Sequence, residues 1–395
     1  MLELKHDLKL AKTRDEKARM NFVSGLRSHV LNDMASGMRA VFDADVEPAF
    51  RRSRKRAPKD GPEVHAAIKP NEYFRFYSSL RVTAQDMVYQ TVREAIDRSR
   101  ETLRARAAWL ASELPLGSLR LNPALEVPRS VSAVDVHLMP GSYHSENGAD
   151  DLVAGSIYDN RLAVSSLGLM GHNLDDIGQT VSHYVRERWP AFAPRAILDL
   201  GCTVGHNTGP WVEQFPQAEV HAIDVAAPCL RYALARARSQ RRAIHFHQMN
   251  AESLEFADAS FDVVFSSMFL HEVPRAGIAR LLREAYRVLR PGGLMVHMEL
   301  PPNGSLAPFD AFYLDWDGAY NNEPFYKPFR DLDPRSIVRE AGFRELKFVE
   351  FALPSWGATN PRQWLSDVQA GVEVESGRTG RLARGVRWYC FGAWK

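Results

Sequence analysis

Hydrophobic residues recur at three- and four-residue steps in the first part of the chain, the spacing that gathers side chains on one face of a helix. One such stripe predicts an amphipathic helix over 21–42, with an apolar face of Phe22, Leu26, Val30, Met34, Met38 and Val41. A second helix is expected over about 83–111, where Thr83 and Asp86 are placed like a capping box. We therefore predict a mainly helical domain over residues 1–150.

The pattern changes near residue 174, where short apolar runs begin to alternate with amphipathic stretches. The runs predict strands at 196–200, 219–223, 243–247, 261–266 and 294–299, and the amphipathic stretches predict helices at 174–189, 228–238 and 278–289. Strands that alternate with helices indicate a mostly parallel sheet with right-handed crossovers. We expect this α/β domain to occupy 151–395, after a boundary in the Pro-, Gly- and Ser-rich residues 113–155.

Composition narrows the class of protein. The chain has 395 residues, 45% of them hydrophobic and 25% charged, which is typical of a globular protein with two or three domains. A net charge of +2 is too small to indicate a nucleic-acid or membrane partner by itself. There is no membrane-length apolar run, no secretory signal pattern and no CxxC among the three cysteines. These features predict a cytoplasmic protein without disulfides, a metal site or a membrane span.

One basic segment, "RRSRKRAPKDGPE" at 51–63, is interrupted by proline and glycine. Such a run is typical of a solvated, mobile loop. The alternative is an electrostatic dock for an acidic partner or a nucleic acid, whose binding would weaken with salt. The nearly balanced charge of the whole chain favours the loop.

The stretch "AILDLGCTVGHNTG" at 196–209 places Gly201 and Gly205 just after the first predicted strand. In an open α/β sheet, ligands bind beyond the carboxyl ends of the strands. A dinucleotide GxGxxG pattern would need glycine at 203 and 206, whereas a GxGxG pattern is missed only at Thr203. Glycine suits these positions because a Cβ would crowd the turn and a ligand against it. Threonine predicts a slightly wider turn or a negative φ at residue 203.

Polar residues also follow the next predicted strands. Asp224 ends the second strand, where a carboxylate can accept hydrogen bonds from both hydroxyls of a ribose, or can instead cap the next helix. Asn250 and Ala251 follow the third strand, where an amide and a backbone N–H could contact an adenine edge. The fourth strand ends in "FSSMFLHEV", and "VLRPGGLMVHMEL" combines a tight turn with the fifth strand.

In this order, the five blocks between 197 and 301 resemble class I S-adenosylmethionine-dependent methyltransferases, especially the small-molecule branch that includes the quinone-biosynthesis methyltransferases. The resemblance continues more loosely through 331–351 and 386–395, which look like the last helix and the closing strands. It implies a Rossmann-like seven-stranded methyltransferase sheet with helices on both faces. It also implies an enzyme that converts S-adenosyl-L-methionine to S-adenosyl-L-homocysteine.

The resemblance further implies roles for residues that match the family's motifs. Asp199 and Gly201 would hold the methionine moiety, Asp224 the ribose and Asn250 the adenine amino group, while Ser266 would border the sulfur. The complete set of expected cofactor-binding residues is Asp199, Gly201, Thr203, Gly205, Asp224, Val225, Asn250, Ala251 and Ser266.

Methyl transfer from an activated sulfonium depends mainly on positioning, and it needs a base only if the accepting group is protonated. Candidate catalytic residues are His271 at the exit of the fourth strand, next to Glu272, and Tyr313 and Asp315 farther along the chain. His297 lies inside the fifth strand, so we expect it to be buried and hydrogen-bonded rather than catalytic.

An aromatic-rich insert at 303–330 follows the fifth strand, where the resemblance places an acceptor pocket. The alternative is a satellite core that seals the N-terminal helices onto the sheet. The expected substrate-contacting residues are Tyr143, His144, Met268, His271, Phe309, Tyr313 and Trp316. The N-terminal domain would then cover the acceptor, form a homodimer, or do both.

These observations predict a methyltransferase that acts on a small, aromatic or heterocyclic metabolite by in-line displacement. Two alternatives stay open: methylation of a macromolecule (RNA or protein) docked on the basic segment, and a cofactor-binding protein that does not methylate. The sequence leaves open the acceptor, the methylated atom and the oligomeric state.

Overall fold

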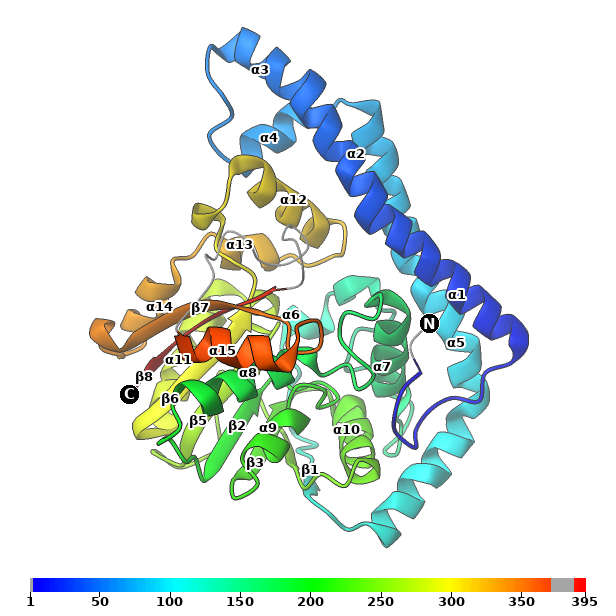
Figure 1. Cartoon of the computed structure of the whole chain (residues 1–395). Coiled ribbons are helices and arrows are strands. Elements are labelled where there is room, and N and C mark those ends of the chain that lie inside the picture. The colour runs from blue at the N-terminus through cyan, green and yellow to red at the C-terminus, as the bar shows by residue number, and fades with distance from the viewer. Residues whose placement is uncertain (1–2, 371–386) are drawn as a thin grey trace.

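The computed structural model describes residues 3–370 and 387–395. Figure 1 shows a twisted sheet flanked by helices, next to a long arm built from the N-terminal helices. The predicted fold class, an α/β sheet with an N-terminal helical part, is confirmed. The predicted boundary at residue 150 stays a prediction.

The sheet has eight strands in the order β1-β4-β3-β2-β5-β6-β8-β7. Every pairing between strands β1 to β6 is parallel, whereas β8 is antiparallel to both β6 and β7. The strand order reverses at β2, which pairs with β3 on one side and with β5 on the other. This reversal is the usual place for a ligand in an open parallel sheet. The strands span Ser118–Arg120 (β1), Ala196–Leu200 (β2), Glu219–Asp224 (β3), His245–Gln248 (β4), Phe261–Ser267 (β5), Leu289–Glu299 (β6), Phe348–Pro354 (β7) and Arg387–Trp394 (β8).

The sheet has one strand more than the predicted seven, and the unpredicted strand is β1. It lies far upstream of the other strands and pairs with β4 at the edge. Its three residues are too few to show an alternating pattern, so the sequence carried no periodic signal for it. The edge strand joins the N-terminal part of the chain to the sheet.

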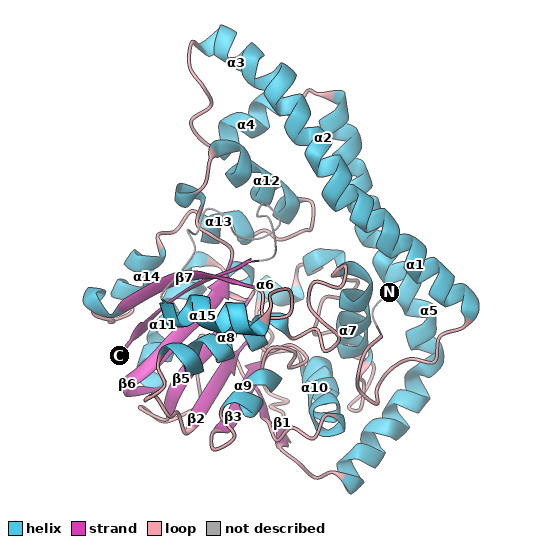
Figure 2. Ribbon diagram, viewed as in Figure 1, coloured by secondary structure: helices cyan, strands magenta, loops and turns pink. Residues whose placement is uncertain are grey.

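Helices cover both faces of the sheet (Figure 2). In β5, Val263 and Phe265 point to one face and Val264 to the other, as the two-residue period of a strand requires. The first face packs against α8, α9, α10 and α15, and the second against α11 and α14. These helices span Asp176–Arg188 (α8), Gly209–Gln214 (α9), Ala227–Ser239 (α10), Arg275–Val288 (α11), Pro334–Glu340 (α14) and Pro361–Ala370 (α15).

The N-terminal arm consists of two long helical stretches that pack together. Helices α1 (Arg14–Ser28), α2 (Met34–Val41) and α3 (Glu47–Arg54) are joined by two short π-helical segments, and α1 and α2 run beside α5 (Glu72–Glu113). A further helix, α7 (Val153–Ser165), packs between α5 and α10. One hydrophobic core combines residues of these N-terminal helices with residues of α10.

Helix α5 begins at Glu72, well before the predicted start near residue 83. Asn71 caps it, because its side chain accepts hydrogen bonds from the backbone N–H groups of Tyr73 (2.9 Å) and Phe74 (3.3 Å). The predicted capping role of Thr83 is wrong, since its hydroxyl donates to the carbonyl of Ser79 (3.0 Å) inside the helix. The aromatic run before residue 83 belongs to the first turns of the helix.

The basic segment 51–63 is not one continuous loop, which corrects the prediction. Its first four residues belong to α3, and its last three begin α4 (Gly61–Ile68). Arg51 forms an ion pair with Glu47 (2.7 Å), and Arg56 with Glu63 (2.6 Å). Neighbouring acids therefore already engage part of the positive charge.

The aromatic insert folds into α12 (Pro308–Ala319) and α13 (Tyr326–Arg330). Phe309 packs on Phe42, with ring centroids 4.8 Å apart, and Trp316 packs on Tyr77 at 4.7 Å. The indole N–H of Trp316 donates to the hydroxyl of Ser78 on α5 (2.8 Å). Fully burying one aromatic side chain of this kind stabilises a fold by about 1.5–3 kcal/mol. The insert therefore forms a core with the N-terminal helices, as the alternative interpretation expected.

Within 3–370 and 387–395, no helix combines the length and the apolar character needed to cross a bilayer. The three cysteines, Cys202, Cys229 and Cys390, are buried and unpaired.

Candidate active site

The glycine turn after β2 has the conformation that only glycine adopts readily. Gly201 and Gly205 have φ angles of 69° and 72°. A Cβ on Gly201 would lie 2.4 Å from the ring of Phe269, so this position has no room for a side chain. The ring of Phe269 therefore occupies the space that a side chain at residue 201 would need.

Thr203 has a φ of +49°, so the negative φ that was one of the two predicted alternatives is wrong. This left-handed conformation is unfavourable for a β-branched residue. The backbone N–H of Thr203 donates to Asp224 Oδ2 (2.9 Å), a bond that stabilises the turn in this form. A side chain at the end of the neighbouring strand β3 therefore stabilises the glycine turn.

A cavity opens beyond the carboxyl ends of the central strands, as expected for this sheet topology. It contains about 500 Å³ of space, part of it open to solvent. Five predicted cofactor-binding residues line it: Gly201, Asp224, Val225, Asn250 and Ala251. Its wall also includes Phe269 and Glu272 from the β5 exit, and Pro128, Ser130 and Val131 from the start of α6 (Arg129–Ser132). No pattern in the sequence predicted the contribution of α6.

The carboxylate of Asp224 lies at the cavity and is also hydrogen-bonded to the backbone. Its carboxylate lines the cavity, and it also accepts hydrogen bonds from the N–H groups of Thr203 and Ala226, both at 2.9 Å. Burial raises the pKa of Asp224 to about 6, against the opposing effect of these backbone bonds. Ala226 directly precedes α10, so the carboxylate anchors both the glycine turn and the start of this helix.

Two of the other predicted cofactor residues make contacts behind the cavity wall. Asp199 is buried and accepts a hydrogen bond from the hydroxyl of Thr208 (2.5 Å), and burial raises its pKa to about 7. Ser266 is hydrogen-bonded to His297 Nδ1 (2.7 Å), and both side chains are fully buried, as the expectation for His297 required. Neither Asp199 nor Ser266, nor Thr203 or Gly205, is among the residues that line the cavity.

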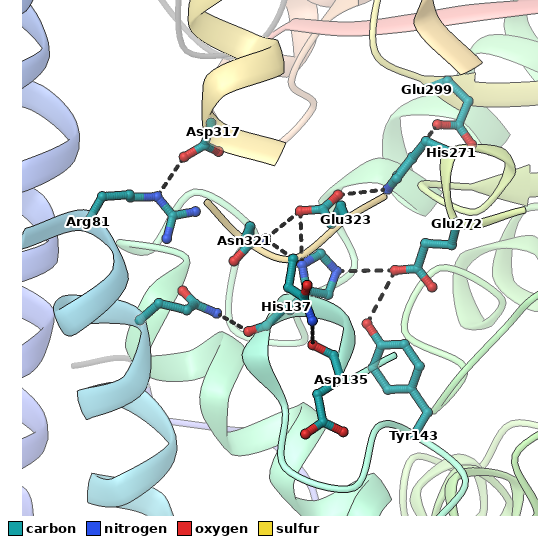
Figure 3. A network of polar contacts seen from close by, with 12 residues as sticks. Arg81, Asp135, His137, Tyr143, His271, Glu272, Glu299, Asp317, Asn321 and Glu323 are labelled. Carbon is teal, nitrogen blue, oxygen red and sulfur yellow. Dashed lines mark hydrogen bonds and ion pairs between the residues drawn. The ribbon is translucent and has the colours of Figure 1, made fainter. Parts of the chain in front are cut away.

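Next to the cavity, the buried side chains of His271, Glu299 and Glu323 form a network with the half-buried side chains of His137 and Glu272 (Figure 3). We call this network the acid–histidine cluster. Glu272 Oε1 lies 3.1 Å from His137 Nε2, and Glu323 Oε1 lies 3.2 Å from His137 Nδ1. Glu299 Oε2 lies 2.6 Å from His271 Nδ1, and Glu323 Oε2 lies 3.6 Å from His271 Nε2. Glu323 thus bridges the two imidazoles.

Four separate segments of the chain bring these side chains together. Glu299 ends β6 and accepts the backbone N–H groups of Phe269 (2.8 Å) and Leu270 (2.6 Å), which fixes the short helix η4 (Leu270–Glu272). His137 lies in η3 (Val136–Leu138) with a left-handed φ of 57°, and its carbonyl accepts the side-chain amide of Gln85 (2.9 Å). Such strain persists only where the surroundings hold it, and it concentrates at functional sites.

Charge within the cluster favours the protonated form of both imidazoles. Burial alone would lower the pKa of His271, but the charge of Glu299 and the hydrogen bond to it raise that pKa to about 9. The pKa of His137 is also raised, because Glu323 and Glu272 outweigh burial. His271 is therefore protonated at neutral pH, and it is paired with the carboxyl group of Glu299.

The structure brings some predicted acceptor-site residues to this cluster. His271 belongs to it, and the hydroxyl of Tyr143 donates to Glu272 Oε1 (3.2 Å). His144 is partly buried, and its Nδ1 has no hydrogen-bond partner. Met268 has a φ of 50° and donates its backbone N–H to the carbonyl of Met298 (2.9 Å) at the β5 exit.

The other predicted residues of the insert lie elsewhere. Asp315 pairs with Arg330 at 2.6 Å, and Tyr313 packs on Trp316 with ring centroids 5.6 Å apart. Phe309 and Trp316 belong to the core shared with the N-terminal helices. The sequence analysis missed His137, Glu299 and Glu323, and only the position of Glu299 at the end of a predicted strand could have indicated one of them.

A second buried network surrounds Asp159 of α7, and we call it the Asp159 cluster. Asp159 Oδ2 accepts hydrogen bonds from His6 Nε2 (2.8 Å) and from the hydroxyl of Tyr232 (2.7 Å), while Oδ1 accepts one from His206 Nε2 (2.7 Å). His206 directly follows Gly205 of the glycine turn. The Asp159 cluster therefore ties the N-terminal segment and α10 to the turn.

A family comparison bears on this site. Residues 197–293, which include the glycine turn, the lining residues from β2 to η4 and the helix α11, match the model of a methyltransferase domain. Over this stretch the chain is therefore similar to methyltransferase domains. The match confirms the predicted methyltransferase core, and it agrees with S-adenosyl-L-methionine as the predicted cofactor.

Curated relatives match mainly this domain. A malonyl-[acyl-carrier protein] O-methyltransferase of Hahella chejuensis is 32% identical over 163 residues, which are 39% of this chain and 55% of that protein. A demethylmenaquinone methyltransferase of Thermus thermophilus is 36% identical over 110 residues, 28% of this chain and 49% of that protein. The chain thus spans about half the length of the curated relatives that it matches.

A solved structure of Haemonchus contortus phosphoethanolamine N-methyltransferase 2 with S-adenosyl-L-methionine covers 57% of this chain and 55% of its own. Its sequence identity is 19% and its TM-score is 0.36, so it supports no conclusion about the site.

Proposed function

We propose that the protein is an S-adenosylmethionine-dependent methyltransferase that binds its methyl donor in the cavity beyond β2 to β5. The observation that carries the proposal is the convergence of Gly201, Asp224 and Asn250 on one cavity, inside the matched methyltransferase domain. The donor fits these residues, because Gly201 and Asp224 line the same cavity and Asp224 offers carboxylate oxygens for a diol.

Each cavity residue has a role in this proposal. Asp224 binds the ribose hydroxyls, and Asn250 and Ala251 contact the adenine edge. Asn250 Oδ1 already accepts the N–H of Glu252 (2.9 Å), so the amide nitrogen is the group left for a ligand. When bound, the donor supplies an electrophilic methyl group on a sulfonium.

The chain itself contributes positioning, water exclusion and charge. Phe269 and the residues of α6 wall the cavity and limit water. Glu272 is the member of the acid–histidine cluster that lines the cavity, and His137 and Tyr143 hold its carboxylate. Glu272 is therefore the group placed to face the methyl donor's positive charge and to orient the proton of an acceptor.

In this proposal, His271 is not the catalytic base that the sequence predicted. It is 1% exposed, does not line the cavity and pairs with Glu299, which fixes the loop that carries Glu272. A group with a pKa of about 9 is protonated at neutral pH and is then no base. We assign His271 as a positioning residue.

The acceptor in this proposal is a small, aromatic or heterocyclic metabolite. The relatives named for demethylmenaquinone support a small acceptor, although they match only part of the chain. The ion pairs of Arg51 and Arg56 weaken the case for a macromolecule docked on the basic segment.

The proposal is tested by heating the protein with S-adenosyl-L-homocysteine. We expect the product to raise the Tm of the wild type, because a ligand that binds only the folded state stabilises it. Asp224→Ala should lose most of this increase, whereas Asp258→Ala, at an exposed carboxylate, should keep it.

Because Asp224 also holds the glycine turn, circular dichroism must show that the variant folds, and Asp224→Asn provides a milder change. An unchanged shift in folded Asp224→Ala and Asp224→Asn would contradict the proposal.

A further inference from the structure

Arg161 of α7 is a buried cation without a hydrogen bond to the protein. It is 6% exposed, its Nε is buried without a partner, and no carboxylate of the described residues lies within ion-pair distance. A guanidinium has five donors, and a charge buried without a partner is costly. Its position therefore calls for an anion that the described part of the chain does not supply.

The other buried arginines of the described residues all have a partner in the protein. Six arginines are buried in the described residues. Arg81, Arg242 and Arg330 pair with carboxylates. Arg236 donates to the carbonyl of Asn173 (2.6 Å), and Arg27 donates to the side chain of Gln85. Arg161 is the exception.

The surroundings of Arg161 place it between the glycine turn and the acid–histidine cluster. Its Cζ lies 4.7 Å from the ring centroid of Tyr158, a cation–π contact that offsets part of the cost of burial. The ring of Tyr158 stacks on His206 of the glycine turn at 5.7 Å and meets Tyr143 edge-on at 5.7 Å. Tyr143 in turn donates to Glu272, which lines the cavity.

Tyr89 adds a second polar group without a partner. Its hydroxyl is buried and makes no hydrogen bond, and its side chain shares a core with Tyr143 and with the apolar part of α7. A hydroxyl and a guanidinium that both lack partners suit a carboxylate, which can accept several hydrogen bonds.

We infer that Arg161 binds the carboxylate of a small-molecule ligand, with the Tyr89 hydroxyl as a second donor. The inference rests on the proposed function, and it names two sources of the carboxylate. One is the amino-acid end of the methyl donor, beside the glycine turn. The other is an acidic group of the acceptor, beside the acid–histidine cluster.

Two nucleosides separate these sources in calorimetric titrations of wild type and Arg161→Met. S-adenosyl-L-homocysteine carries the carboxylate, and 5′-methylthioadenosine lacks it. If the methyl donor is the source, Arg161→Met weakens binding of S-adenosyl-L-homocysteine about tenfold or more, which is about 1.4 kcal/mol. Binding of 5′-methylthioadenosine stays unchanged, and Arg161→Lys restores part of the loss because it keeps the charge.

If the acceptor is the source, both nucleosides bind Arg161→Met as they bind the wild type. The wild-type complex with S-adenosyl-L-homocysteine then binds benzoate, used as a simple aromatic acid, and the Arg161→Met complex does not. Unchanged binding of both nucleosides, without any effect on benzoate, overturns the inference alone. A wild type that binds neither nucleoside overturns the proposed function and this inference together.

Stability separates a ligand-binding arginine from a structural one. Without ligand, Arg161→Met should keep or raise the Tm, because it removes a buried charge that has no protein partner. Arg186→Met, at an exposed arginine paired with Glu187, is the matched control and should leave all the titrations unchanged. A large fall in Tm for Arg161→Met without ligand would show a structural role and overturn the inference.

Discussion

The Asp159 cluster and the acid–histidine cluster both consist of histidines and acids, and both join N-terminal segments to the matched domain. They differ in the ratio of acidic groups to their partners. Asp159 is one carboxylate with three donors around it, and it is completely buried. The acid–histidine cluster has three acids for two histidines, and Glu272 reaches the cavity. A saturated buried charge holds a fold together, whereas excess charge at a cavity edge indicates a binding or catalytic site.

The largest effect is expected at Asp159. Asp159→Ala leaves His6, His206 and Tyr232 without their shared acceptor, and breaking a buried charged network costs about 3–5 kcal/mol. Urea unfolding measures this loss of stability, with Asp258→Ala as the exposed control. A loss below about 1 kcal/mol would show that the Asp159 cluster is not a structural anchor.

The contribution of the acid–histidine cluster to the free energy of unfolding should depend on pH. The folded pKa of His271 is about 9, above its ordinary value of 6.5, so the protonated form is favoured by folding. Its contribution is complete below about pH 6.5 and is lost as the pH rises through 9, by up to about 3 kcal/mol in total.

Urea unfolding of wild type and His271→Gln between pH 6 and 10 measures this contribution. The difference in stability between the two proteins should shrink as the pH rises. A difference that is constant over this range would contradict the assigned charge state of His271.

The smallest effect is expected at Glu272. Glu272→Gln removes negative charge from the cavity edge, so it should weaken the cationic S-adenosyl-L-methionine more than the uncharged thioether of S-adenosyl-L-homocysteine. A change of about tenfold in the ratio of the two dissociation constants, near 1.4 kcal/mol, is the expected size. Calorimetric titration measures both constants, and Asp159→Asn, provided that it folds, should leave the ratio unchanged. An unchanged ratio in Glu272→Gln would remove the distinction between the two clusters.

The sequence predicted the regular part of the fold well, because strands and amphipathic helices carry a periodic signal over many residues. The strand predicted at 196–200 coincides with β2, and the predicted fourth and fifth strands lie within β5 and β6. Strand β1 was missed because three residues show no period. The start of α5 was missed because the cap at Asn71 precedes a cluster of aromatic residues rather than a clear apolar stripe.

The candidate site was predictable only where its residues follow a strand directly. Gly201, Asp224 and Asn250 lie at strand ends, and they do line one cavity. His137 and Glu323 join the acid–histidine cluster through tertiary contacts between segments almost 200 residues apart, and nothing local in the sequence marks them. The left-handed φ of Thr203 likewise depends on a bond to Asp224 in the next strand.

A crystal structure of the complex with S-adenosyl-L-homocysteine tests the central claim most directly. The account predicts the ribose hydroxyls within hydrogen-bond distance of Asp224, the adenine beside Asn250 and Ala251, and the homocysteine along the glycine turn. A nucleoside bound elsewhere, or a cavity that stays empty at saturating ligand, would contradict it.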